Sequence, residues 1–212
     1  MEQGTCFFKK IRNEEKRREK EERKDAYSMK KIGIFMADGC EEIEGLTVVD
    51  LLRRANIEIV MLSIMGRKEV TGSHKITFFA DELAENVDFE TFDGIILPGG
   101  MPGTTNLGAN ATVNEVIKKF AAEGKLVGAI CAAPSVLGAA GILVGKKATS
   151  YPGFEDKLTG AMVCEDAVVV CDNLITSRGM GTAMEFGFEI ITYLNEGNPE
   201  VANSLRKGTI YE

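Results

Sequence analysis

A cysteine at the end of an apolar run is the residue of this chain best placed to do chemistry. Leu126–Ile130 is short and apolar, Cys131 follows it, and small residues lead into Pro134 and the helix-like stretch Ser135–Ala140. This order predicts a nucleophile elbow, which holds a side chain out at the carboxyl end of a sheet. A thiol at a helix N-terminus lies near unpaired backbone N–H groups, which favour the reactive thiolate. The local pattern fits a buried structural cysteine equally well.

Three carboxylates stand at the start of another helix-like stretch, at Glu41, Glu42 and Glu44. A favourable interaction with the helix dipole accounts for Glu41 and Glu42. Glu44 shares a helical face with Val48 and should turn inward, where an unpaired carboxylate would be costly. Burial and a neighbouring thiolate would raise its pKa. A protonated Glu44 would then donate a hydrogen bond to the sulfur and carry a proton.

The third feature is the turn Pro98–Gly99–Gly100, which closes the apolar stretch Gly94–Leu97. No Gly-Lys-Ser/Thr continuation follows, which argues against a phosphate loop. Glycine permits positive φ and a close backbone approach to a ligand. A backbone N–H here could form an oxyanion hole with the N–H of Ala132. Taken alone, the turn is better explained as a plain strand-to-loop connection.

Bulk composition limits the classes of protein to consider. The chain has 212 residues, 44% of them hydrophobic, and a net charge of −7, which does not suggest a nucleic-acid partner. No apolar run is long enough to span a bilayer. Five cysteines without a C-x-x-C pair argue against a disulfide scaffold or zinc ribbon, and no secretory signal is visible, so we expect a cytoplasmic protein.

The single histidine, His74, lies in a loop flanked by glycine and serine and is expected to be exposed. One histidine leaves too few ligands for a typical zinc site. No nucleotide-binding fingerprint is present either. We therefore expect neither a metal nor a cofactor.

From Lys31 onward, strand and helix patterns alternate. Strands are predicted at Lys31–Met36, Glu58–Ser63, Gly94–Leu97 and Leu126–Ile130, with a hairpin formed by Val168–Cys171 and Leu174–Thr176 around Asp172–Asn173. Helices are predicted at Ile43–Ala55, Thr112–Glu123 and Thr182–Leu194, the last with Thr182 as its cap. This alternation indicates a mostly parallel sheet covered on both faces. Its carboxyl edge would bring together Ala37–Glu44, Pro98–Gly103 and Cys131.

The N-terminal 28 residues differ from the rest of the chain. They contain a charged run with almost no apolar face to bury, so we expect them to be disordered or loosely helical. Met29 precedes the first strand like a natural start. The segment is either an upstream extension or a genuine tail, and the globular domain is expected to span residues 29–212.

Taken together, E-E-I-E after the first strand, I-L-P-G-G and A-I-C-A-A-P resemble the ThiJ/PfpI superfamily. Within it, the chain is most similar to the branch of the parkinsonism-associated redox protein and its bacterial relatives. The resemblance runs from about Lys30 to Leu205 and includes Val49–Ala55 and Thr176–Thr182. It implies a single-domain flavodoxin-like α/β sandwich, similar to class I glutamine amidotransferases, and a homodimer.

Carried over to this sequence, the resemblance implies that Cys131 is the oxidisable cysteine and Glu44 its protonated partner. Gly99, Gly100 and Ala132 would line the anion pocket. The pocket wall would include Tyr151, Arg54, Arg178 and Met180. Peptidase members carry a histidine where this chain has Ala132, which argues against proteolysis. Some members carry a pocket histidine before a proline, where this chain has Tyr151, a poor base at neutral pH.

Three functions fit these residues. The first is a glutathione-independent glyoxalase or deglycase, in which Cys131 attacks methylglyoxal or a related dicarbonyl adduct and Glu44 moves the proton. The second is an oxidative-stress sensor in which Cys131 becomes a sulfinate held by Glu44. The third is a chaperone-like dimer without catalysis. Cys131 and Glu44 serve both of the first two, so the sequence does not separate them.

Overall fold

The computed structural model describes residues 30–211, which build a seven-stranded sheet of order β10-β11-β7-β6-β1-β2-β5. Its strands are β1 (Lys31–Met36), β2 (Glu58–Ser63), β5 (Glu82–Leu83), β6 (Gly94–Leu97), β7 (Leu126–Ile130), β10 (Val168–Cys171) and β11 (Leu174–Ser177). Every neighbouring pair is parallel except β10 and β11. The predicted mostly parallel sheet is therefore confirmed.

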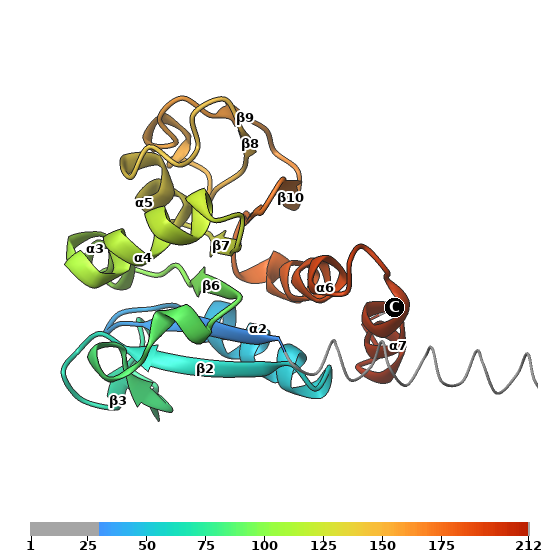
Figure 1. Cartoon of the computed structure of the whole chain (residues 1–212), viewed down its shortest axis with the longest axis horizontal. Coiled ribbons are helices and arrows are strands. Elements are labelled where there is room, and N and C mark those ends of the chain that lie inside the picture. The colour runs from blue at the N-terminus through green and yellow to red at the C-terminus, as the bar shows by residue number, and fades with distance from the viewer. Residues whose placement is uncertain (1–29, 212) are drawn as a thin grey trace, which may run out of the picture.

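Helices cover both faces of this sheet (Figure 1). One apolar layer contains side chains of α2 (Glu42–Arg54), α6 (Ala183–Leu194) and α7 (Glu200–Gly208). The other contains side chains of α3 (Gly103–Ala109), α4 (Ala111–Ala122) and α5 (Pro134–Ala139). Strands buried on both faces read as continuous apolar runs, which explains why β6 and β7 were recognisable in the sequence.

Two further pairs of short strands lie outside the seven-stranded sheet. β3 (Glu69–Thr71) and β4 (Thr77–Phe79) form an antiparallel hairpin, and β8 (Lys147–Ala148) pairs in parallel with β9 (Met162–Val163). Short 3-10 turns lie at Ala84–Asn86, Phe89–Thr91, Glu155–Lys157 and Met180–Thr182. Within residues 30–211, no helix is both long and apolar enough to cross a membrane.

The predicted hairpin is also present, with β10 and β11 joined through Asp172, whose φ is 54°. The expected role of Thr182 is wrong. It precedes α6, but its side chain makes no capping bond to that helix. Its hydroxyl instead exchanges hydrogen bonds with Gly179 and Ser177, closing the turn before the helix. The charged segment 1–28 lies outside the described residues.

The order of the sheet decides where the site lies. β1, β6 and β7 are adjacent and parallel, so the chain leaves all three at one edge. The loop after β1 and the turn after β6 are joined there by a 3.0 Å hydrogen bond from the N–H of Glu41 to the carbonyl of Gly99. Cys131 follows β7 at the same edge. The predicted convergence of these three segments is confirmed.

Candidate active site

Cys131 stands on a strained turn between β7 and α5. Its φ is 65°, a left-handed conformation that non-glycine residues rarely adopt. Its N–H donates to the carbonyl of Ser177 at 2.9 Å, and its carbonyl accepts from the N–H of Tyr151 at 2.8 Å. Held from both sides, the backbone keeps a conformation that costs energy, as functional sites often do. The predicted nucleophile elbow is therefore present.

Glu44 lies in the first turn of α2 and is only 1% exposed. Its Oε2 accepts the N–H of Gly99 at 3.0 Å, and its side chain hydrogen-bonds that of Cys131. Burial raises the pKa of Glu44 to about 7, although the bonds from Cys131 and Gly99 act in the opposite direction. Glu44 therefore faces inward and its pKa is raised, as the sequence predicted, while the prediction that it stays protonated remains a prediction.

The pKa of the Cys131 thiol is raised, whereas a position at a helix N-terminus was expected to lower it and favour the thiolate. Burial and the nearby Glu44 carboxylate raise the pKa of Cys131, while N–H groups of Gly100 and Ala132 act to lower it. The expectation failed because it considered the helix N-terminus and left out desolvation. The repulsion from Glu44 disappears when that carboxyl is protonated, so the protonation of one group depends on that of the other.

The two glycines of the turn after β6 have different tasks. A Cβ on Gly99 would lie 2.6 Å from both Cys131 Cβ and Glu44 Oε2, so only glycine lets the pair approach. Gly100 has a φ of +85°, and its N–H hydrogen-bonds the Cys131 sulfur together with that of Ala132. The oxyanion prediction for Gly99 is corrected, because its N–H is already donated to Glu44.

A cavity of about 560 Å³ opens over the sulfur. It is lined by Glu41, Glu44, Gly100, Cys131, Tyr151, Pro152, Arg178, Gly179, Met180, Gly181 and Thr182. Tyr151, Arg178 and Met180 therefore lie where the sequence analysis expected them. Tyr151 and Met180 are about half exposed, which leaves the cavity open to solvent. Its size suits a small substrate.

Arg54 does not line this cavity, so the single chain does not place it in the expected pocket wall. It ends α2, ten residues after Glu44, so the helix carries it about 15 Å along its axis. Its guanidinium pairs with Asp50 one turn earlier, on an exposed surface. The resemblance placed Arg54 without the helix length, which sets it at the opposite end of α2 from the site.

The contacts of Glu42 were not predicted from the sequence. A favourable interaction with the helix dipole was expected to account for Glu42. Its side chain is only 3% exposed, however, and it contacts the loop after β3. Its Oε1 accepts backbone N–H groups of His74 and Ile76. Gly72 is the residue in the sequence that points to this contact. A Cβ at position 72 would lie 2.2 Å from the Glu42 carboxyl, so the loop can approach Glu42 only with a glycine there.

A doubly covered, mostly parallel sheet with a cysteine on a nucleophile elbow and a buried carboxyl beside it defines a flavodoxin-like α/β protein with a cysteine–carboxyl site. Residues 30–193 match the DJ-1/PfpI family, to which this chain belongs.

Individual relatives support the same family. Glutathione-independent glyoxalase DJR-1.2 of Caenorhabditis elegans is 38% identical over 172 residues, 80% of this chain and 90% of that protein. Protein DJ-1 homolog B of Arabidopsis thaliana is 40% identical over 74% of this chain, which spans only 36% of that longer protein. The structure of oxidized Toxoplasma gondii DJ-1 superimposes with a TM-score of 0.81 at 36% identity, covering 85% of this chain and 97% of that one.

Proposed function

We propose that this protein is a cofactor-independent glyoxalase or deglycase that acts on methylglyoxal and related dicarbonyl adducts. The observation that carries the proposal is the hydrogen-bonded pair of Cys131 and Glu44 at the floor of an open cavity. The glyoxalase name of the Caenorhabditis elegans relative supports the same reaction class.

The first step joins sulfur to substrate. The Cys131 thiol attacks the aldehyde carbon of methylglyoxal, forming a C–S bond, and its proton reaches the new oxygen through Glu44. A hemithioacetal results. The N–H groups of Gly100 and Ala132 already contact the sulfur, so they lie within reach of the developing oxyanion.

The second step moves a proton between carbons. The Glu44 carboxylate removes the hydrogen from the former aldehyde carbon, giving an enediol, and returns it to the neighbouring carbon. The product is a thioester of lactate, which water hydrolyses to lactate and the free thiol. A carboxyl whose pKa is about 7 can both accept and give a proton near neutral pH.

The test is an assay of the purified, chelator-treated protein with methylglyoxal and without added thiols. We expect lactate to appear in an amount equal to the methylglyoxal consumed, over many turnovers per chain. Loss of methylglyoxal limited to one equivalent, with no lactate, would contradict the enzymatic proposal.

A second candidate is an oxidation sensor. The donors that surround the sulfur, the Gly100 and Ala132 N–H groups and a protonated Glu44, could equally stabilise the oxygens of a Cys131 sulfinate. This candidate is favoured if turnover is absent and mild peroxide oxidises Cys131 before the other cysteines. Both candidates need a reduced thiol, for which we propose the cytoplasm as the compartment.

We also propose that the chain forms a homodimer. Ile43 on α2, Ile76 in the β3–β4 loop and Phe79 on β4 are 49%, 56% and 69% exposed. Ile43 follows Glu42, which binds the N–H of Ile76, so the first two lie close together. A second copy of this chain would bury these side chains as a self-complementary surface.

Light scattering should therefore give twice the chain mass, both for the full chain and for one starting at Met29. Phe79→Asp should shift the protein to the monomer mass while its circular dichroism stays unchanged. A full-length chain that is monomeric at micromolar concentration would contradict the proposal.

A further inference from the structure

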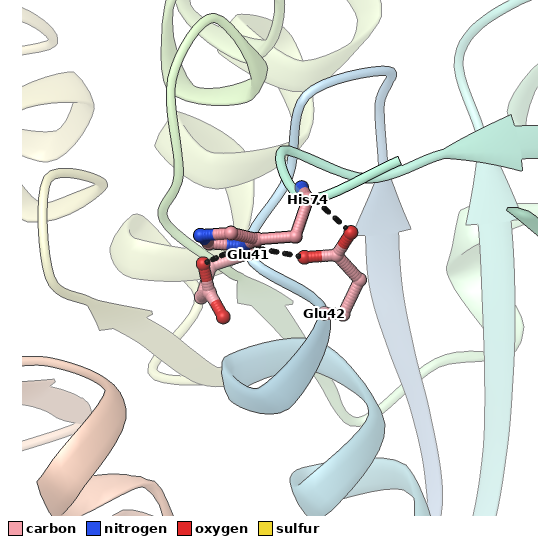
Figure 2. A group of neighbouring side chains, drawn as sticks. All are labelled: Glu41, Glu42 and His74. Carbon is pink, nitrogen blue, oxygen red and sulfur yellow. Dashed lines mark hydrogen bonds and ion pairs between the residues drawn. The ribbon is translucent and has the colours of Figure 1, made fainter. Parts of the chain in front are cut away.

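Glu41, Glu42 and His74 form a compact cluster at the rim of the cavity, which the proposed reaction does not use (Figure 2). Glu41 immediately precedes α2, Glu42 begins it, and His74 lies in the loop between β3 and β4. The Nδ1 atom of His74 is 3.1 Å from Glu41 Oε2 and 3.2 Å from Glu42 Oε2. One ring nitrogen thus faces two carboxylates.

The surrounding chain fixes the side chains of this cluster in place. Backbone N–H groups of His74 and Ile76 hold Glu42 Oε1, which leaves Oε2 directed at the imidazole. The absence of a side chain at Gly72 makes room for the Glu42 carboxyl. The Ser73 hydroxyl adds a fourth possible ligand atom, 3.0 Å from Glu41 Oε2, 3.4 Å from Glu42 Oε2 and 3.1 Å from His74 Nδ1.

These separations match a metal coordination sphere. Ligands at about 2.0–2.1 Å around a tetrahedral zinc ion lie about 3.3–3.4 Å from one another. Five of the six distances among the four atoms range from 3.0 to 3.4 Å, and the ligand atoms of Glu41, Glu42 and His74 all lie within 4.8 Å of one another, so side-chain shifts could bring them around an ion. A nitrogen with two carboxylates suits zinc, cobalt or nickel better than calcium or magnesium, which prefer all-oxygen sites.

We propose that Glu41, Glu42 and His74 bind a divalent transition-metal ion of the zinc type, with Ser73 or water completing its coordination. His74 is 69% exposed, so the ion has an open path from solvent. The ion would tie the β3–β4 loop to the start of α2 beside the cavity that Glu41 lines. This site is separate from the Cys131 sulfur, and the proposal does not depend on the glyoxalase reaction.

The single histidine makes a direct test possible. Tag-free, ¹⁵N-labelled full chain gives one imidazole signal set, because the sequence contains one histidine. Titration with Zn²⁺ should move the Nδ1 resonance and saturate at one equivalent per chain. The alternative is that the cluster is only an ion pair between a protonated His74 imidazole and the two carboxylates. In that case Zn²⁺ would leave Nδ1 unmoved, which overturns the proposal.

Variants assign the ligands by calorimetry with Zn²⁺. Because even outer-shell partners contribute about 10- to 100-fold to metal affinity, His74→Gln should weaken this binding at least about 100-fold. Glu42→Gln should weaken it as well. Glu69→Gln, which removes an exposed carboxylate on β3, is the matched control and should bind as the unmodified chain does.

His74 projects into solvent, so its replacement should not prevent folding, and circular dichroism checks this. Titration with Co²⁺ tests whether the metal binds to cysteine thiolates instead of to the cluster. A thiolate-to-cobalt charge-transfer band that persists in His74→Gln, together with unchanged zinc affinity, would place the ion on cysteine and overturn the proposal.

Discussion

Cys131→Ser is expected to lower kcat/KM for methylglyoxal by at least about 1000-fold, as loss of an enzyme nucleophile does. Serine nearly preserves the shape of the side chain and the donors around it. Its hydroxyl, however, is far less acidic than a thiol and cannot be activated by a carboxyl whose pKa is about 7. The measurement is lactate formation by both proteins at equal concentration. Equal turnover would show that the reaction does not proceed through this sulfur.

Two controls accompany this variant. Cys164→Ser changes a partly exposed cysteine outside the cavity and should leave turnover intact. Substoichiometric alkylation should label Cys131 before Cys40, because Cys40 is only 1% exposed whereas Cys131 lines the open cavity. Thermal unfolding of Cys131→Ser should remain close to that of the unmodified protein, so that a loss of activity is not a loss of fold.

The main sheet could be predicted because its strands are short, apolar and separated by amphipathic helices. β6 and β7 are buried throughout, and such runs have few alternatives when a helix precedes and follows them. The short strands β8 and β9 gave no such signal, since two-residue pairings depend on contacts that come from elsewhere in the chain. Thr182 shows a related limit, because a hydroxyl before a helix can bond backwards into its own turn as well as forward.

The central pair of the site was predictable for a local reason. Cys131 directly follows a continuous apolar strand, and helical periodicity turns Glu44 inward from a helix start. Glu42 was not predictable in the same way, since its partner His74 is 32 residues further along the chain. Arg54 does not line the cavity of its own chain, and its place in a pocket wall near a dimer interface stays a prediction. Desolvation of Cys131 likewise depends on the whole fold rather than on the elbow sequence.

Glu44→Gln is expected to reduce turnover by about 100- to 10,000-fold, the usual contribution of a positioned acid–base group. The amide can still accept the Gly99 N–H and donate to the sulfur, but it cannot carry a proton between carbons. Glu44→Asp keeps the proton and withdraws the carboxyl by one methylene, so it should also lose turnover and should accumulate less Cys131 sulfinate under mild peroxide. Full activity of Glu44→Gln would exclude the proton-carrying role.

The same variant should change how stability depends on pH. Burial raises the pKa of Glu44 from 4.5 to about 7, so the folded protein holds this proton more tightly than the unfolded chain does. The contribution of this bound proton to the free energy of unfolding is complete below pH 4.5 and is lost as the pH rises through about 7. At about 1.4 kcal/mol per pKa unit, the loss amounts to about 3 kcal/mol.

Glutamine does not titrate, so the free energy of unfolding of Glu44→Gln should rise relative to that of the unmodified protein by about 2.5 kcal/mol between pH 5 and pH 8. Urea unfolding at pH 5, 6, 7 and 8 measures this difference in the free energy of unfolding. The exposed replacement Glu69→Gln is the control and should keep a nearly constant offset across the series. A constant offset for Glu44→Gln as well would mean that Glu44 ionises in the folded protein as it does in the unfolded chain. The proton that the proposed reaction moves would then have to be held by another group.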